Sequence, residues 1–142
     1  MSFVNHKFLK KDDLEDRKYQ SNISKACLEQ STLVILPTGM GKTVVALRIM
    51  LERLDIGKIL LMAPTKPLAQ QHFDFFNNFL KADVSLFTGA ISPSEREPLW
   101  DSSQVIISTP QVISKDIEAK RASLKEFSLV IFDEAHRAVG NY

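Results

Sequence analysis

Residues 33–43 read Leu-Val-Ile-Leu-Pro-Thr-Gly-Met-Gly-Lys-Thr, an apolar run followed by a short loop that contains two glycines. A short apolar run bounded by turn residues predicts a buried strand, and the apolar pattern after it predicts a helix. Gly39 and Gly41 permit backbone conformations closed to other residues, so successive N–H groups can point at phosphate oxygens. Lys42 adds a cation, and Thr43 brings a hydroxyl for Mg²⁺ to the first helical turn, where the helix dipole favours an anion. The predicted phosphate-binding residues are Thr38, Gly39, Met40, Gly41, Lys42 and Thr43.

The loop departs at one position from the strict pattern of a phosphate-binding loop, because Leu36 stands where that pattern has its first glycine. The cradle depends on Gly39, Gly41 and Lys42, which are all present. The alternative interpretation is a glycine-rich turn between a strand and a helix with an incidental lysine. A second motif in the same chain makes that alternative less favourable.

A second apolar run, residues 129–132, ends in Asp133-Glu134-Ala135-His136. Asp133 at the end of a buried strand is suited to hold Mg²⁺ through its water shell, and Glu134 to orient or deprotonate an attacking water. An acidic pair alone could simply cap the next element. Together with the first motif, it predicts a nucleotide triphosphatase with catalytic residues Lys42, Asp133 and Glu134.

The three histidines differ in what the sequence says of them. His136 has no partner ligands at metal-binding spacing, so we expect it to couple the site to a second lobe or to make a structural hydrogen bond. His6 and His72 carry no functional argument.

Composition agrees with one incomplete α/β domain. The chain has 142 residues, 44% of them hydrophobic, and contains no apolar stretch long enough to span a bilayer. The single Cys27 and the lack of a charged-then-apolar leader predict a soluble protein of a reducing, cytoplasmic compartment. The net charge of +1 gives no general attraction to nucleic acid, so any such contact must be local.

Strand-like and helix-like patterns alternate along the chain, which predicts a mostly parallel sheet covered by helices on both faces. The expected strands are residues 32–36, 58–63, 84–87, 104–108 and 128–132.

Helices are expected between these strands, one of them over residues 41–54. Pro67, Ser92-Pro93 and Thr109-Pro110 each predict a helix start. Leu68, Phe73, Phe76 and Phe79 are spaced as a buried helical face, so we favour core packing over base stacking for these phenylalanines.

Four further segments occupy the positions that sequence motifs have in superfamily 2 helicases. Three of them follow the second, third and fourth predicted strands, and one precedes the first. Ala63-Pro64-Thr65-Lys66-Pro67-Leu68-Ala69-Gln70 resembles motif Ia of that superfamily, and Thr88-Gly89 and Thr109-Pro110 resemble its two further nucleic-acid-contact motifs. Arg17-Lys18-Tyr19-Gln20 resembles the adenine-reading Q motif. The amino-acid sequences of motif Ia and of residues 133–142 most resemble those of archaeal Hef helicases and their eukaryotic relative, the Fanconi anaemia group M translocase. Dicer and the innate RNA sensors share the layout less closely.

The resemblance covers nearly the whole chain and implies the N-terminal part of a RecA-like, ATP-binding lobe over residues 1–142. It implies a helicase or translocase that uses ATP and Mg²⁺ and acts on forked or branched DNA. Such a protein would be cytoplasmic, associated with the nucleoid, and involved in DNA repair. Arg17 and Gln20 would then contact the adenine. The implied nucleic-acid contacts are Pro64, Thr65, Lys66, Gln70, Thr88, Gly89, Thr109 and Pro110. Taken singly, Thr88-Gly89 could be an ordinary turn and Thr109-Pro110 an ordinary helix start.

In this family the arginine finger comes from a second RecA-like lobe of the same protein, so we expect negligible turnover by this chain alone. A module that binds nucleotide or nucleic acid without turnover, and an RNA-directed helicase lobe, remain alternatives. A small kinase is disfavoured by motif Ia, and a GTPase by the lack of an Asn-Lys-x-Asp segment.

The resemblance also implies that a motif III strand lies between the strands that carry motifs I and II. Because unpaired buried N–H and C=O groups cost about 1 to 3 kcal/mol each, we expect the gap left by its absence to be closed. A strand borrowed from the N-terminal segment or exchanged with a neighbouring molecule is favoured over direct pairing of residues 33–36 with 129–132, since direct pairing would disturb the spacing between Lys42 and Asp133.

Overall fold

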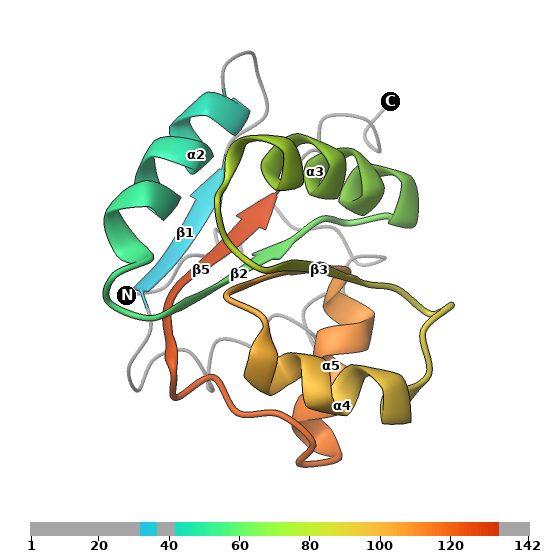
Figure 1. Cartoon of the computed structure of the whole chain (residues 1–142). Helices are drawn as coiled ribbons and strands as arrows, with labels where there is room; N and C mark the ends of the chain where they lie inside the picture. Colours follow the sequence, from blue (N-terminus) through green and yellow to red (C-terminus); the bar gives the residue numbers. More distant parts are fainter. Residues whose placement is uncertain (1–31, 37–41, 134–142) are drawn as a thin grey trace, which may run out of the picture.

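The computed structural model describes residues 32–36 and 42–133, which form a parallel sheet flanked by four helices (Figure 1). The strands are β1 (Thr32–Leu36), β2 (Lys58–Met62), β3 (Val84–Phe87), β4 (Val105–Ser108) and β5 (Phe127–Asp133). Each lies within about one residue of the range predicted from its apolar run. The predicted α/β class is therefore confirmed.

The strand order in the sheet is β1-β5-β2-β4-β3, and every neighbouring pair is parallel. In the central strands β2, β4 and β5 nearly every residue is buried, as expected for strands that have helices on both faces. This arrangement explains why those strands read as continuous apolar runs instead of alternating ones.

Four helices connect the strands: α2 (Lys42–Arg53), α3 (Lys66–Phe79), α4 (Pro93–Ser102) and α5 (Pro110–Glu118). The predicted helix starts are confirmed. Thr65 caps α3, and Ser92 caps α4 through a capping box in which Glu95 bonds back to the Ser92 N–H. Thr109 is the N-cap of α5, but its side chain makes no capping hydrogen bond.

The helices divide between the two faces of the sheet, with α2 and α3 on one side and α4 and α5 on the other (Figure 1). The side chains of α2 and α3 pack with Leu36, Leu61 and Ile131 in one buried cluster. Those of α4 and α5 pack with Leu60, Ile106 and other strand residues in a second cluster. The sheet thus separates two apolar cores.

The phenylalanine face of α3 is only partly buried. Phe76 is fully buried and Leu68 and Phe73 are partly buried in the core, but Phe79 is 58% exposed, so the expectation for Phe79 is wrong. Phe79 lies in the last turn of α3, and its ring contacts only Phe75 among the described aromatic residues.

The sheet has no gap between β1 and β5, and the preference for a borrowed or exchanged strand is wrong. The two strands pair directly over five positions, from Thr32 opposite Leu129 to Leu36 opposite Asp133. Direct pairing satisfies the N–H and C=O groups that an open gap would leave unpaired. Arg53 reinforces the pair, because its Nη1 donates to Thr32 Oγ1 at 3.1 Å and to Ser128 O at 3.0 Å.

A buried ionic cluster joins α4 and α5. Asp116 is fully buried and accepts two hydrogen bonds from Arg96, at 2.8 Å from Nε and 2.6 Å from Nη2. Trp100 Nε1 donates at 2.8 Å and Arg121 Nε at 3.1 Å to the same carboxylate. Arg96 Nη1 also donates to Ile91 O at 2.6 Å, so the cluster holds the loop after β3 as well.

The surroundings of Asp116 set its protonation. Burial by itself would raise the pKa of Asp116, but hydrogen bonds from Arg96, Trp100 and Arg121 outweigh burial and leave the pKa below its usual value. A carboxyl whose pKa is lowered in the folded state stabilises the fold above its unfolded pKa, and this stabilisation is lost as the pH falls through the folded value.

We predict that Asp116→Asn lowers the free energy of unfolding by about 3 to 5 kcal/mol at pH 7, because Arg96 is left buried without its counter-charge. The difference from wild type should shrink as the pH falls below about 4, the unfolded pKa of Asp. Urea unfolding between pH 7 and pH 3 measures both effects. Asp101→Asn, a change of an exposed carboxylate, is the control, and equal stability of the two variants would contradict the prediction.

Candidate nucleotide and nucleic-acid site

All five strands of the sheet are parallel, so their carboxyl ends lie at one edge. In open α/β sheets this edge, outside the strand ends, is where ligands bind. Predicted site segments follow all five strands, whereas the segment with Arg17 and Gln20, which precedes β1 in the sequence, lies outside the described residues. The strand order places the two predicted nucleotide motifs, after β1 and β5, on one half of this edge, here called the nucleotide half. The three predicted nucleic-acid motifs, after β2, β4 and β3, lie on the other half, here called the nucleic-acid half.

On the nucleotide half, Leu36 and Asp133 are register partners at the ends of β1 and β5. The end of β1, after which the predicted phosphate-binding sequence follows, therefore lies beside Asp133. Thr43 is half-buried in the first turn of α2. The remaining predicted nucleotide residues lie outside the described part of the structure: Arg17, Gln20, Thr38, Gly39, Met40, Gly41, Glu134, His136 and the side chain of Lys42.

The donors on this half suit a hard divalent cation. Asp133 offers a carboxylate and Thr43 a hydroxyl, the oxygen ligands that Mg²⁺ takes alongside water and phosphate. Within residues 32–36 and 42–133, no group of three or more His, Cys, Asp or Glu side chains could hold a metal unaided. The donor set therefore fits Mg²⁺ that is bound together with a nucleotide.

The loop after β2 presents the polar start of α3. Thr65 accepts a hydrogen bond from Leu68 N at 3.3 Å, while Lys66 and Gln70 are exposed and Pro64 is half-buried. The Gln70 amide donates to Asp74 at 2.9 Å on the same helix, so this side chain is partly occupied within the chain. Lys66 is the exposed cation at this helix start.

The loop after β3 is a tight turn in which the Thr88 hydroxyl accepts from Ala90 N at 3.3 Å and the Thr88 carbonyl accepts from Ile91 N at 3.1 Å. Gly89 is exposed, and a Cβ added there would meet nothing within 4 Å. Nothing in the described structure therefore requires a glycine at this position. A glycine here does leave its backbone N–H open to close approach by a phosphate.

The loop after β4 leads directly into α5. Pro110 occupies the first helical turn, and Thr109 is only 7% exposed. Unlike Thr65 and Ser92, Thr109 does not use its hydroxyl to cap its helix. The helix start is thus fixed by Pro110 and by packing, which leaves the hydroxyl available for another role.

His72 is the residue of this edge that sequence reasoning missed. It lies on α3, is 5% exposed, and its Nε2 is 2.7 Å from Oδ2 of Asp133, which is fully buried. The two residues are 61 positions apart in the chain. The available signal was weak: a histidine at an otherwise apolar helical position, three residues after Ala69 and four before Phe76, both buried.

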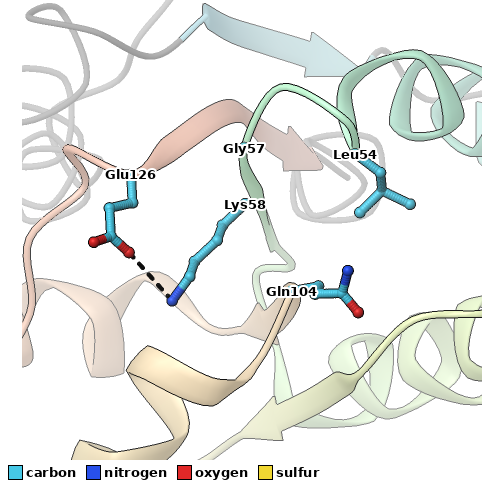
Figure 2. A pocket seen from close by; sticks show the side chains of 5 residues that line it. All are labelled: Leu54, Gly57, Lys58, Gln104 and Glu126. Carbon is cyan, nitrogen blue, oxygen red and sulfur yellow. Dashed lines mark ion pairs between the residues drawn. The ribbon is translucent and has the colours of Figure 1, made fainter.

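A hollow of about 300 Å³ lies at the opposite end of the sheet, where Gly57, Gln104 and Glu126 precede β2, β4 and β5 (Figure 2). Figure 2 shows Lys58 reaching toward Glu126, with 3.5 Å between the charged atoms. Lys58 Nζ also donates to the carbonyls of Trp100 at 2.6 Å and Asp101 at 2.8 Å, at the end of α4. The lysine is therefore engaged in holding α4, and the hollow is separate from the candidate site.

No helix in the described ranges is long and apolar enough to cross a membrane.

A parallel sheet with a phosphate-loop sequence after β1 and an acidic pair starting at the end of β5 defines the class of RecA-like nucleotide-binding lobes. Within that class, this chain belongs to the DEAD/DEAH box helicase family, whose family model matches residues 17–142. The chain also resembles the crystal structure of the Pyrococcus furiosus Hef helicase domain, with 46% sequence identity and a TM-score of 0.66 over 94% of this chain and 29% of that one.

Curated relatives agree with this family. An archaeal protein of Methanocaldococcus jannaschii whose name describes an ATP-dependent RNA helicase is 39% identical over 99% of this chain. The DEAD-box ATP-dependent RNA helicase FANCM of Arabidopsis thaliana is 39% identical over 89%, and the ATP-dependent DNA helicase MPH1 of Candida albicans is 37% identical over 100%. The chain spans only 19%, 10% and 12% of these three proteins, respectively.

Thr65 and Thr109 are both N-cap residues, but only Thr65 makes a capping hydrogen bond, so substituting them should affect stability differently. Thr65→Val should lower the free energy of unfolding by about 1 kcal/mol, because the Leu68 N–H loses its acceptor. Thr109→Val should change it by less than about 0.5 kcal/mol, because no capping bond is lost. Urea unfolding of both variants beside wild type tests this, and a larger loss for Thr109→Val than for Thr65→Val would refute it.

Proposed function

We propose that this chain is the ATP-binding lobe of a helicase or translocase that acts on forked or branched DNA. The observation that carries the proposal is the strand order, which puts the sequences proposed to bind nucleotide, after β1 and β5, on one half of the edge and those proposed to bind nucleic acid, after β2, β4 and β3, on the other. A motor of this kind needs both ligands on one rigid lobe. The membership of the DEAD/DEAH box family supports the same function.

On the nucleotide half, the backbone N–H groups of residues 38–41 and the Lys42 ammonium hold the β- and γ-phosphates, and Arg17 and Gln20 contact the adenine. Thr43 and Asp133 would hold Mg²⁺, and the bound ion would neutralise charge on the phosphates. Glu134 orients or deprotonates the attacking water, and His136 couples the site to a second RecA-like lobe of the same protein. Hydrolysis then depends mainly on positioning and on charge stabilisation.

On the nucleic-acid half, the short side chains and bare backbone of the three loops suit contact with phosphates and not with base edges. Lys66 supplies charge, Gly89 a backbone that can be approached closely, and Thr109 a hydroxyl not needed by its helix. Contacts of this type let a protein move along a strand whatever its sequence. The other proposed contacts are Pro64, Thr65, Gln70, Thr88 and Pro110.

DNA is preferred over RNA as the substrate on the strength of the Hef-type resemblance, and a nucleoid-associated role in DNA repair follows from it. Among the relatives, MPH1 is named a DNA helicase, whereas the other two names say RNA helicase. The second candidate is therefore an RNA-directed lobe, and the third a module that binds without turnover. Phosphate release in the presence of the second RecA-like lobe, abolished by Glu134→Gln, would exclude the third.

We predict that the chain binds Mg-ATP and that Lys42→Ala weakens binding about 10- to 100-fold, the equivalent of one hydrogen bond to a charged group. Isothermal titration calorimetry measures the affinity, and Lys81→Ala, an exposed lysine just beyond α3, is the control. Equal binding by wild type and Lys42→Ala would remove the nucleotide assignment.

We also predict that the chain binds forked DNA more tightly than blunt duplex DNA or a forked RNA of equal length. Lys66→Ala should weaken binding to all sequences equally and reduce the slope of log K against log salt by about 1. Fluorescence anisotropy between about 50 and 200 mM salt, a range over which affinity that depends on phosphate contacts falls steeply, measures both effects. Lys125→Ala, at the opposite end of the sheet, is the control. An equal loss of DNA affinity in the Lys66 and Lys125 variants would contradict the assignment of the nucleic-acid half. Tighter binding of the RNA than of the DNA would favour the second candidate.

A further inference from the structure

The contact between His72 and Asp133 connects the two halves of the site. Asp133 ends β5, which belongs to the nucleotide half, whereas His72 lies on α3, the helix that begins with the nucleic-acid loop after β2. Because β5 and β2 are neighbours in the sheet, the second turn of α3 passes close to the end of β5. The Nε2 to Oδ2 distance of 2.7 Å is that of a strong, charge-assisted hydrogen bond.

The direction of this hydrogen bond follows from its partners. When Asp133 is ionised, the form that binds a cation, its carboxylate only accepts hydrogen bonds, so Nε2 of His72 then carries the hydrogen and donates it to Oδ2. The imidazole is itself held in place, since it stacks on Phe76 with 6.0 Å between ring centroids and an interplanar angle of 29°. Phe76 is fully buried in the core. A rigid donor therefore fixes the orientation of the Asp133 carboxylate.

From this geometry we infer that His72 is a positioning residue for the Asp133 carboxylate, which it holds in the orientation that accepts the divalent metal of the bound nucleotide. The inference rests on the proposed function, because it takes Asp133 as the carboxylate that meets this metal. Hydrogen bonds to metal-binding carboxylates commonly contribute 10- to 100-fold to metal affinity. His72 does not touch nucleotide or metal itself, so its effect acts through Asp133.

A purely structural role for His72 predicts something different. A buried hydrogen bond that only stabilises the fold would, when removed, lower the free energy of unfolding and leave metal binding by the folded protein unchanged. The two roles are separated by measuring metal affinity and stability in the same variants. Gln offers a rescue, because its side-chain NH₂ can donate to Oδ2 from nearly the position of the imidazole Nε2.

The experiment uses the 142-residue chain with ADP and Mn²⁺, whose free concentration is followed by electron paramagnetic resonance. We expect His72→Leu to weaken Mn²⁺ binding in the ADP complex about tenfold or more. His72→Gln should recover most of that loss, and Gln71→Leu, a change on the exposed side of the same turn, should match wild type. Urea unfolding without metal or nucleotide is measured for all four proteins.

The outcomes separate this inference from the proposed function. If wild type takes up no Mn²⁺ in the presence of ADP, both are overturned. If wild type binds Mn²⁺ and His72→Leu binds it equally well, only the role of His72 is overturned. The same holds if His72→Leu and His72→Gln lose metal affinity to the same extent, because the hydrogen bond would then not be the cause.

Discussion

The parallel pairing of five strands is the constraint on which the rest of the structure depends. Parallel strands require a crossover between each pair, and here helices supply these crossovers and bury both faces of the sheet. A consequence is that every strand points its carboxyl end at the same edge. Residues far apart in sequence, such as Leu36 and Asp133, therefore lie at one edge because of the strand directions alone. No contact between the loops themselves is needed.

The strand order then determines which loops lie next to one another at that edge. With β5 between β1 and β2, the end of β5 lies next to the end of β1 on one side and next to the end of β2, which leads into α3, on the other. α3 is thus the element that borders both halves. The hydrogen bond from His72 to Asp133 makes this proximity a physical contact.

A buried ion pair connects two of the segments on the nucleic-acid half. Asp116 on α5 and Arg96 on α4 form a bidentate pair, and Arg96 also holds the carbonyl of Ile91 in the loop after β3. The loop at Thr88-Gly89 and the helix that begins at Pro110 are consequently fixed relative to each other. In the proposed function, these two loops contact one nucleic-acid backbone, which requires a fixed separation between them. A buried bidentate pair can supply this rigidity, whereas isolated surface ion pairs would provide little.

Local sequence determined the elements of this protein and the residue types of its candidate site. Apolar runs gave the strands to within about a residue, and Ser-Pro and Thr-Pro pairs gave the helix starts, because backbone periodicity and capping are set by neighbours a few residues away. The candidate motifs were predicted in the same way, although residues 37–41 and 134–142 lie outside the described structure. Only the tertiary structure decided that β1 pairs directly with β5, that Phe79 is exposed, and that Asp116 and Asp133 find partners in Arg96 and His72. The strand pairing and the two carboxylate contacts join residues 20 to about 100 positions apart, which no local periodicity specifies. They depend on which of several possible pairings leaves the fewest buried polar groups unsatisfied.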